Sequence, residues 1–237
     1  MNPVKKLDNI LRKIEIIFLI LKLQLDTCYC KNKMALFKDP ELLEAGVDEV
    51  ARGCLAGPVY AAAVIWPKEL ELEDDIVLRD SKKLSKKKRE EMRDYIEATA
   101  LDFAVAFETP EVIDKKNILN ASISAMHKAI DGLNIEPESL LIDGNKFKPY
   151  IRNGELIPHE CFVKGDDLYQ SISAASILAK VYHDEYITEL VDNDPTLEIY
   201  DWKKNMCYGT KIHLEAIKNN GISVHHRKTF GICREYA

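Results

Sequence analysis

The chain has 237 residues, of which 46% are hydrophobic and 30% are charged. This composition supports a sizeable core under a well-solvated surface, and it excludes an intrinsically disordered chain and a protein that spans a membrane several times. The formal net charge of −6 argues against a nucleic-acid partner, yet residues 80–93 hold seven basic against three acidic residues, and residues 203–237 seven against two. Because contacts with phosphate are local, these basic stretches leave nucleic-acid binding open.

In chain order, the hydrophobic pattern predicts strands that alternate with helices. The predicted elements are a strand at Glu44–Val47, a strand at Val59–Trp66, a helix at Ser81–Ala98, a strand at Phe103–Phe107, a helix opening at Thr109-Pro110, a helix at Asn117–Leu133, strands at Ser139–Ile142 and Glu160–Val163, a helix at Leu168–Val191, and a helix capped by Thr210 that stops before Asn220-Gly221.

This alternation indicates an α/β fold with helices on both faces of a sheet, over residues 34–191. Residues 192–237 lack strand patterns and are predicted to form a C-terminal helical appendage that binds substrate. Residues 1–33 fit an amphipathic helix, a family-specific extension or a stretch added by a mistaken start codon. We favour a mistaken start or a dispensable extension. Charges interrupt the apolar run at Ile16–Leu21, so neither a membrane span nor a signal peptide is predicted there.

Acidic residues close to glycine mark the ends of three predicted strands, at Asp48-Glu49, Asp143-Gly144 and Gly165-Asp166. Carboxylates that converge on one sheet edge repel one another, and divalent cations relieve that repulsion. Oxygen ligands without His or Cys indicate magnesium or manganese, and two such ions can activate water for phosphodiester hydrolysis. Two alternatives stay open, since Asp-Gly is an ordinary turn dipeptide and the pattern fits many metal-dependent phosphoryl-transfer enzymes.

Several segments together resemble ribonuclease HII in order and spacing, from about Leu42 to Gly231. They are GVDEVARGCLAGPV at Gly46–Val59, DSKKL at Asp80–Leu84, IDGN at Ile142–Asn145, KGD at Lys164–Asp166, SAASILAKV at Ser173–Val181, YGT at Tyr208–Thr210 with His213, and HHRKTFG at His225–Gly231.

The resemblance implies a ribonuclease H-like mixed β-sheet flanked by helices. It also implies an endonuclease that hydrolyses the RNA strand of RNA–DNA hybrids, nicks 5′ of ribonucleotides embedded in duplex DNA, and leaves 3′-hydroxyl and 5′-phosphate ends. The implied ligands of two Mg²⁺ or Mn²⁺ ions are Asp48, Glu49, Asp143 and Asp166. Asp167 is a neighbouring carboxylate, but successive strand side chains point to opposite faces, and the family pattern selects Asp166.

Substrate contacts are implied in the same way. The family loop that contacts the ribonucleotide through backbone groups is Ala51-Arg52-Gly53 here, with alanine in place of the first glycine. If that position needs a positive φ, alanine costs roughly 1 kcal/mol. Tyr208 matches a family tyrosine that packs against the sugar beyond the ribonucleotide, although a surface aromatic before a helix cap is the simpler alternative. Met206-Cys207 stands where Lys-Gly is usual. The change removes a positive charge and a glycine, so it bears on the expected loop conformation and on phosphate binding.

The candidates for phosphate contacts are basic or hydroxyl-bearing: Ser81, Lys82 and Lys83 first, then Arg227 and Lys228. His225 and His226 are expected to pack or pair structurally, and His183, where an arginine is common, has no assigned role. The six cysteines lack any CxxC pair or zinc spacing, which favours a reducing, cytoplasmic setting. We expect a monomer whose partner is an RNA–DNA hybrid or ribonucleotide-containing DNA, with no membrane.

Three alternatives differ in what they require. Ribonuclease HIII carries a folded N-terminal domain, for which a 33-residue extension is too small. Another metal-dependent nuclease or resolvase on the same fold would share the acids but would also cut an all-DNA substrate. A catalytically silent binding module would hold a hybrid without nicking it, and the presence of all four acids argues against this.

Overall fold

The computed structural model describes residues 34–69 and 84–237. The strands are β1 (Glu44–Val50), β2 (Val59–Ile65), β3 (Asp102–Glu108), β4 (Ser139–Asp143), β5 (Tyr150–Arg152), β6 (Glu155–Ile157) and β7 (His159–Phe162). The α-helices are α2 (Lys86–Thr99), α3 (Pro110–Lys116), α4 (Ile118–Asp131), α5 (Gln170–Asn193), α6 (Trp202–Asn205) and α7 (Lys211–Asn220). The 3₁₀ helices are η3 (Gly165–Asp167), η4 (Pro195–Tyr200) and η5 (Gly231–Glu235).

The main sheet is mixed, with strand order β3-β2-β1-β4-β7. β1 pairs antiparallel with β2, and β2 with β3, whereas β1–β4 and β4–β7 are parallel. The carboxyl ends of β1, β4 and β7 therefore lie at one edge of the sheet. Five of these strands were predicted from their apolar runs, and each forms close to its predicted bounds.

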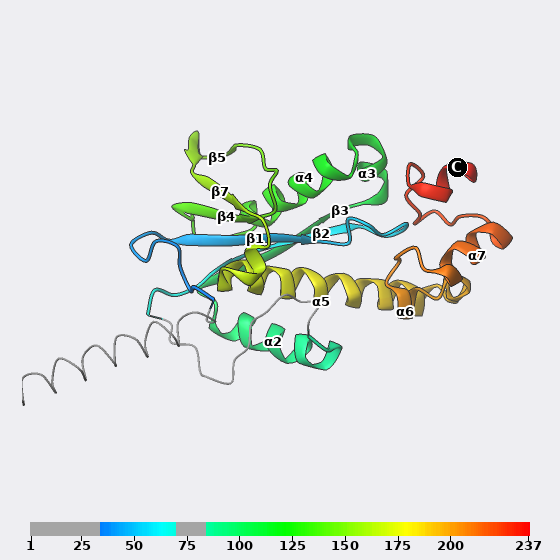
Figure 1. The fold of residues 1–237 in the computed structure, drawn as a ribbon, viewed down its shortest axis with the longest axis horizontal. Helices are drawn as coiled ribbons and strands as arrows, with labels where there is room; N and C mark the ends of the chain where they lie inside the picture. Colours follow the sequence, from blue (N-terminus) through cyan, green and yellow to red (C-terminus); the bar gives the residue numbers. More distant parts are fainter. Residues whose placement is uncertain (1–33, 70–83) are drawn as a thin grey trace, which may run out of the picture. The chain divides into compact units, whose positions relative to one another are not determined.

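Helices cover both faces of the sheet, as predicted (Figure 1). One core lies between the sheet and α4, and alternate strand residues such as Val47, Ala61 and Ala63 point into it. The opposite core lies against α2 and α5, with Ala62 and Val64 pointing the other way. This alternation follows the period of two along a strand, and it explains why β2 is buried along its whole length.

The start of α5 lies directly against β1. A Cβ atom added at Gly46 would come within 2.2 Å of the Ser171 carbonyl carbon and 2.4 Å of the Ile172 nitrogen. These contacts are with backbone, so no side-chain movement relieves them, and only glycine fits at this crossing. Gly46 thereby sets how closely the long helix approaches the strand that carries Asp48 and Glu49.

The C-terminal elements pack on the second half of α5 (Figure 1). Their core joins Trp202, Ile217 and Cys233 to Ile187 of α5 and to Cys54 in the loop after β1. Thr210 caps α7 as predicted, by accepting a hydrogen bond from the His213 N–H at 3.4 Å. This appendage is therefore built against the segment that follows the first predicted acids.

One element was missed, one expectation needs correction, and one prediction lies partly outside the described residues. The β5–β6 hairpin was not predicted; its turn is Asn153-Gly154, with φ of 53° and 86°, the conformation that Asn-Gly favours in two-residue hairpins. The chain after β7 is a 3₁₀ turn rather than strand. The predicted helix at Ser81–Ala98 begins at Lys86 within the described part, after the N-cap Ser85.

Within the described residues, no helix is both long and apolar enough to cross a lipid bilayer. The cysteines found there, Cys54, Cys161, Cys207 and Cys233, are free thiols.

Candidate active site

Acidic side chains gather where three neighbouring strands end. Asp48 and Glu49 lie on β1, and Asp143 is the last residue of β4. β1 and β4 pair in parallel up to the residues just before Asp48 and Asp143, so these two acids follow at the same level. Asp166 lies in η3, just after β7, which pairs in parallel with β4. The sheet topology thus brings all four predicted acids to one edge.

Asp48 is the most buried of the four, with 6% of its surface exposed. Burial raises the pKa of Asp48 well above its usual value, and the charges of Glu49 and Asp143 raise it further. Hydrogen bonds from the Ser176 hydroxyl and the Glu49 N–H (2.7 Å) oppose this rise. The balance still disfavours the charged form, as expected for a buried carboxylate close to other carboxylates.

Glu49 lies beside this cluster and is partly neutralised. Its side chain is 10% exposed, and its Oε1 accepts a hydrogen bond from Nη1 of Arg52 at 3.0 Å. Burial raises the pKa of Glu49, Asp143 adds to the rise, and Arg52 opposes it. Arg52 is therefore an internal counter-charge for one acid, in addition to being a member of the predicted substrate loop.

Gly165 fixes the turn that carries Asp166. Its N–H donates to Oδ1 of Asp143 at 2.8 Å, which ties η3 to the end of β4. A Cβ atom at Gly165 would lie 2.6 Å from Cδ1 of Ile172 and 3.2 Å from Cβ of Phe162. A larger residue would force the buried Ile172 side chain to move and would press on Phe162, so close packing favours glycine at this position of the KGD segment.

Asp166 is half-buried and Asp167 is exposed. The expectation that only one of the pair faces the site was argued from strand alternation, and that argument is wrong because both residues lie in a 3₁₀ turn. Across residues 34–69 and 84–237, no three His, Cys, Asp or Glu side chains are grouped closely enough to enclose an ion as they stand. The four acids are neighbours at one edge rather than a closed cage.

The loop after β1 begins with a positive φ, the condition under which alanine was expected to be strained at this position. Ala51 has a φ of 71° and is 2% exposed, so alanine occupies a left-handed position. Arg52 and Gly53 are exposed. Tyr208, 37% exposed, lies against this loop: Cys54 forms an antiparallel bridge with it, and a Cβ atom at Gly53 would lie 3.8 Å from its ring.

Met206 and Cys207 also adopt left-handed conformations, with φ of 46° and 64°. They lie where the resemblance led us to expect Lys-Gly. Their carbonyl groups are bound to the loop: Leu55 N–H donates to the Cys207 carbonyl at 2.9 Å, and the Cys54 thiol contacts the Met206 carbonyl at 3.3 Å. The segment before Tyr208 is therefore held against the substrate loop even without glycine.

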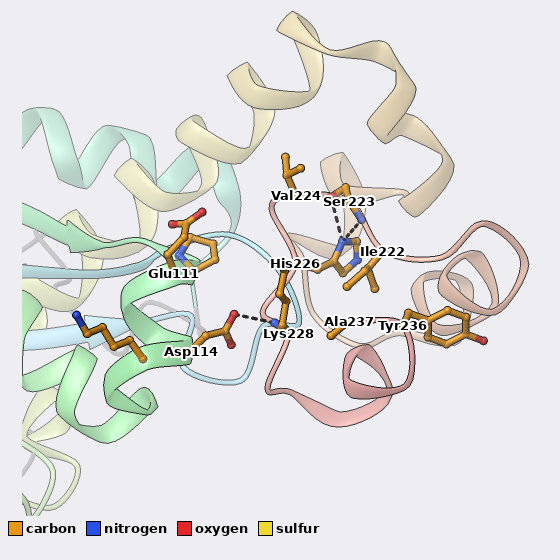
Figure 2. A pocket seen from close by; sticks show the side chains of 11 residues that line it. Glu111, Asp114, Ile222, Ser223, Val224, His226, Lys228, Tyr236 and Ala237 are labelled. Carbon is orange, nitrogen blue, oxygen red and sulfur yellow. Dashed lines mark hydrogen bonds between the residues drawn. The ribbon is translucent and has the colours of Figure 1, made fainter.

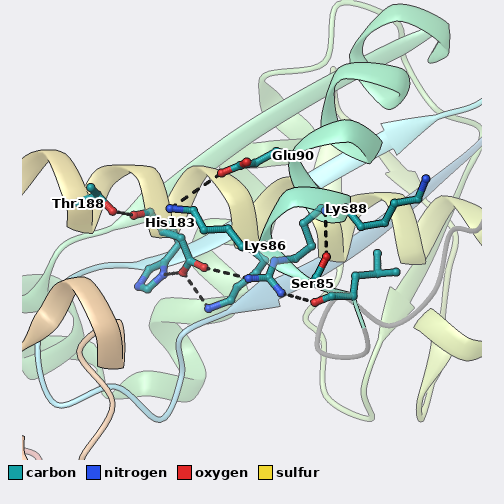
Figure 3. Close-up of polar contacts among 10 residues, drawn as sticks. Ser85, Lys86, Lys88, Glu90, His183 and Thr188 are labelled. Carbon is teal, nitrogen blue, oxygen red and sulfur yellow. Dashed lines mark hydrogen bonds and ion pairs between the residues drawn. The ribbon is translucent and has the colours of Figure 1, made fainter.

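A buried polar network on α5, which the sequence did not reveal, includes His183 (Figure 3) and lies beside Tyr208. Asp184 is 7% exposed and accepts from Nζ of Lys180 at 2.8 Å and Nδ1 of His183 at 3.0 Å. Burial alone would raise the pKa of Asp184, but the hydrogen bond from His183 and the charge of Lys180 hold it below its usual value. Nη2 of Arg89 on α2 lies 3.6 Å away. The network holds the Lys180 ammonium 5.8 Å from the centre of the Tyr208 ring.

Arg227, a secondary candidate for phosphate contacts, is fully buried. Its guanidinium donates to the carbonyls of Gly57 (2.9 Å), Arg52 (3.1 Å) and Pro58 (3.0 Å). Burial lowers the pKa of Arg227. The expectation of a phosphate contact is therefore wrong for this residue: its donors point into the protein and bind the backbone of the loop.

Histidines link the C-terminal segment to Tyr208, and their proton positions follow from their partners. Ser223 N–H donates to Nδ1 of His226 at 2.9 Å, so the ring proton of His226 is on Nε2 and points at Nε2 of His213, 3.1 Å away. His213 Nε2 also accepts from Trp202 at 3.0 Å, so the His213 proton is on Nδ1 and donates to the Tyr208 carbonyl at 3.0 Å. Both rings are neutral, which agrees with the expected structural role of His226.

The remaining predicted residues fall elsewhere. Ser81, Lys82 and Lys83 lie outside the described residues. A cavity of about 810 Å³ lies between α3 and the C-terminal segment, and its lining includes Asp114, Val224 and Lys228 but none of the four acids (Figure 2). This cavity is therefore distinct from the acidic edge of the sheet.

Comparison with known proteins agrees with this arrangement. The family model described as ribonuclease HII matches residues 45–233. The chain is 53% identical over 193 residues to ribonuclease HII of Parabacteroides distasonis, which covers 81% of this chain and 92% of the relative. The crystal structure of ribonuclease H2 from Pyrococcus horikoshii OT3 matches with a TM-score of 0.68 and 26% identity, over 81% of this chain and 96% of that one.

A more distant structure, Bst-RNase HIII in complex with Mn²⁺, matches with a TM-score of 0.59 and 19% identity, over 82% of this chain and 69% of that one. This likeness concerns the fold alone. The fold predicted from the sequence, a ribonuclease H-like mixed sheet flanked by helices with a C-terminal helical appendage, is confirmed. The chain belongs to the ribonuclease HII family and is a metal-dependent endoribonuclease.

Proposed function

We propose that this endonuclease hydrolyses the RNA strand of RNA–DNA hybrids and nicks duplex DNA on the 5′ side of an embedded ribonucleotide, leaving 3′-hydroxyl and 5′-phosphate ends. The observation that carries the proposal is the convergence of Asp48, Glu49 and Asp143 at the carboxyl edge of parallel strands, where burial and then the charges of the neighbouring acids raise the pKa values of Asp48 and Glu49. An acidic edge of this kind repels nucleic acid unless cations neutralise it.

The residues present fit divalent cations. All four acids offer oxygen ligands, the donor type that Mg²⁺ and Mn²⁺ prefer, and Asp48 is buried with a raised pKa that a bound cation would reverse. We propose Asp48, Glu49, Asp143 and Asp166 as the ligands. When bound, two such ions supply a Lewis acid for the attacking water and neutralise charge on the departing 3′ oxygen.

The protein positions these ligands in three ways. Gly165 N–H orients the Asp143 carboxylate, the Ser176 hydroxyl and the Glu49 N–H orient that of Asp48, and Arg52 holds Glu49. Because these three acids are already held, little reorganisation of their carboxylates is needed when substrate arrives. The four acids are thus proposed to act as ligands, and no nucleophilic side chain takes part.

Substrate discrimination is proposed to come from the Ala51–Gly53 loop and Tyr208. The loop exposes backbone groups next to the acids, and Tyr208 offers a partly exposed ring beside Gly53. An enzyme that distinguishes RNA from DNA must sense the 2′-hydroxyl, which is both donor and acceptor, and backbone groups meet this need. Ser81, Lys82 and Lys83 are proposed as phosphate contacts on sequence grounds alone.

The test is cleavage of a DNA duplex with one ribonucleotide, in Mg²⁺ and separately in Mn²⁺, beside an all-DNA duplex. A nick directly 5′ of the ribonucleotide, with the all-DNA duplex intact, supports the proposal. Cleavage of a long hybrid without a nick at the single ribonucleotide would shift the preference to continuous RNA. Cleavage of the all-DNA duplex would contradict ribonucleotide recognition, and binding without any cleavage would contradict the catalytic role of the acids.

A further inference from the structure

We propose that Arg227 is a positioning residue for ribonucleotide recognition, because its guanidinium sets the direction of the Gly53 N–H. This inference rests on the proposed function, in which backbone groups of the Ala51–Gly53 loop contact the ribonucleotide. It assigns a recognition role to a residue that lies in the C-terminal segment, 174 positions after Gly53 in the chain (227 − 53).

The guanidinium is surrounded by carbonyl groups of one loop. Three of its nitrogens donate to Arg52, Gly57 and Pro58 at 2.9–3.1 Å, and it lies 5.1 Å from the centre of the Phe230 ring. The planar fork of a guanidinium fixes the relative directions of all three acceptors at once. Arg227 therefore determines how the loop backbone turns between the predicted substrate contacts and β2.

The bond to Arg52 has a direct consequence for Gly53. In a planar trans peptide the C=O and N–H groups point in opposite directions. Because the Arg52 carbonyl points inward at Arg227, the N–H of Gly53 in the same peptide points outward. Gly53 is exposed, and among the residues the structure describes none accepts a hydrogen bond from this N–H. The loop thus presents an unpaired donor beside the Tyr208 ring.

The segment that carries Arg227 is itself anchored on both sides. Gly57 N–H donates to the His225 carbonyl at 2.9 Å, and Arg227 N–H donates to the Leu55 carbonyl at 2.8 Å. On the other side, Asp114 of α3 accepts from the backbone N–H groups of Lys228 and Thr229, each at 2.9 Å (Figure 2). The segment is therefore tied to the loop on one side, and on the other side its bonds to Asp114 hold it independently of the loop.

The decisive variant is Arg227→Lys, which keeps the charge but cannot reach three acceptors in one plane. The readout is the ratio of the inhibition constant of an all-DNA duplex to the KM of the same duplex with one ribonucleotide. We expect this ratio to fall about tenfold, as for a lost hydrogen bond at a recognition site. The Mn²⁺ affinity measured by calorimetry without nucleic acid should stay unchanged. Lys218→Gln, a change at an exposed basic residue of α7, is the matched control and should leave the ratio unchanged.

Two further variants separate positioning from general stability. Gly53→Pro removes the donor itself, and Gly53→Ala keeps it, because its Cβ atom would meet the Tyr208 ring only at 3.8 Å. If Arg227 acts through this N–H, Arg227→Lys adds no further loss of the ratio in the Gly53→Pro background. Losses that multiply would overturn the proposal, as would an unchanged ratio in Arg227→Lys.

If Arg227→Lys does not fold, Asp114→Ala replaces it as the test. This variant frees the anchored segment but leaves the guanidinium intact, so the ratio should fall about threefold, and an unchanged ratio would overturn the proposal. Failure of the proposed function looks different, because the unaltered protein would then not nick the ribonucleotide duplex at all, and the inference would fall with it.

Discussion

Lowering the pH should destabilise the protein through His226. This ring is 1% exposed, and burial, together with the neighbouring His213, lowers the pKa of His226 to about 3 in the folded protein. In the unfolded chain the ordinary value of about 6.5 applies. Below about pH 6.5 the unfolded state therefore binds a proton at His226, and the folded state does not. The free energy of unfolding decreases as the pH falls below about 6.5, and it goes on decreasing down to about pH 3.

The magnitude follows from the 1.36 kcal/mol that one pH unit is worth for one proton. Between pH 7 and pH 5, about 1.5 units lie below the unfolded pKa, so His226 alone should lower the free energy of unfolding by about 2 kcal/mol. Any folded pKa below about 4 gives the same result, because the folded state then stays unprotonated throughout this range.

The assay is urea denaturation at pH 7, 6 and 5, for the unaltered protein and for His226→Gln. Buried carboxyls with raised pKa, such as Asp48 and Glu49, gain stability over the same range, but they do so in both proteins and cancel in the difference. At pH 7 the variant should be less stable because it loses the bond to His213; by pH 5 the gap should narrow by about 2 kcal/mol. Parallel stability curves, within about 0.5 kcal/mol, would refute the reasoning.

Three further changes test other parts of the structure. Asp143→Asn should abolish cleavage, because the amide carries no charge for a cation. The circular dichroism spectrum should stay unchanged, because the amide oxygen still accepts the hydrogen bond from the Gly165 N–H. Full activity would contradict the ligand assignment. Ala51→Gly should change the free energy of unfolding by less than about 1 kcal/mol, because the relief of left-handed strain is offset by the loss of a buried methyl group and by the greater freedom of the unfolded chain. Ala56, which has no positive φ, provides the control: Ala56→Gly should lower the free energy of unfolding by about 1–2 kcal/mol. Gly46→Ala should lower the free energy of unfolding by about 3 kcal/mol, since its Cβ atom would meet α5 backbone at 2.2 Å, and a thermal melt within error of the unaltered protein would contradict this contact.

The sheet and its acidic edge could be predicted because they depend on local patterns. Apolar runs marked the strands, and the acids at Asp48 and Asp143 follow those runs directly. Parallel pairing then brings strand ends together without any further information from side chains. The Asn153-Gly154 hairpin carried an equally local signal, and its turn type shows that this dipeptide would have been enough to predict it.

The supports of the site could not be predicted, because each depends on partners distant in the chain. Arg227 looks like a surface cation in the sequence, and only the carbonyls of Arg52, Gly57 and Pro58 make its burial favourable. Lys180 and Asp184 have the i,i+4 spacing of an exposed helical ion pair, but Arg89 of α2 and Tyr208 of the appendage pack beside them. Local patterns therefore identify the groups proposed to bind metal, whereas the groups that orient them require the tertiary structure.

Three of the seven non-glycine residues with positive φ in the described part of the chain lie in the two segments next to Tyr208 that are proposed to contact substrate. Ala51, Met206 and Cys207 are non-glycine residues in left-handed conformations, which cost roughly 1 kcal/mol each. Such conformations persist only where surrounding contacts over-determine them. Here the carbonyls of Met206 and Cys207 are bound by the Cys54–Leu55 segment, and Arg227 and Cys54 bind the loop that begins at Ala51. The two segments thus hold each other in their left-handed conformations through these hydrogen bonds. A change in the backbone of one should therefore alter the other, and Ala51→Gly should shift Tyr208 as well as its own loop.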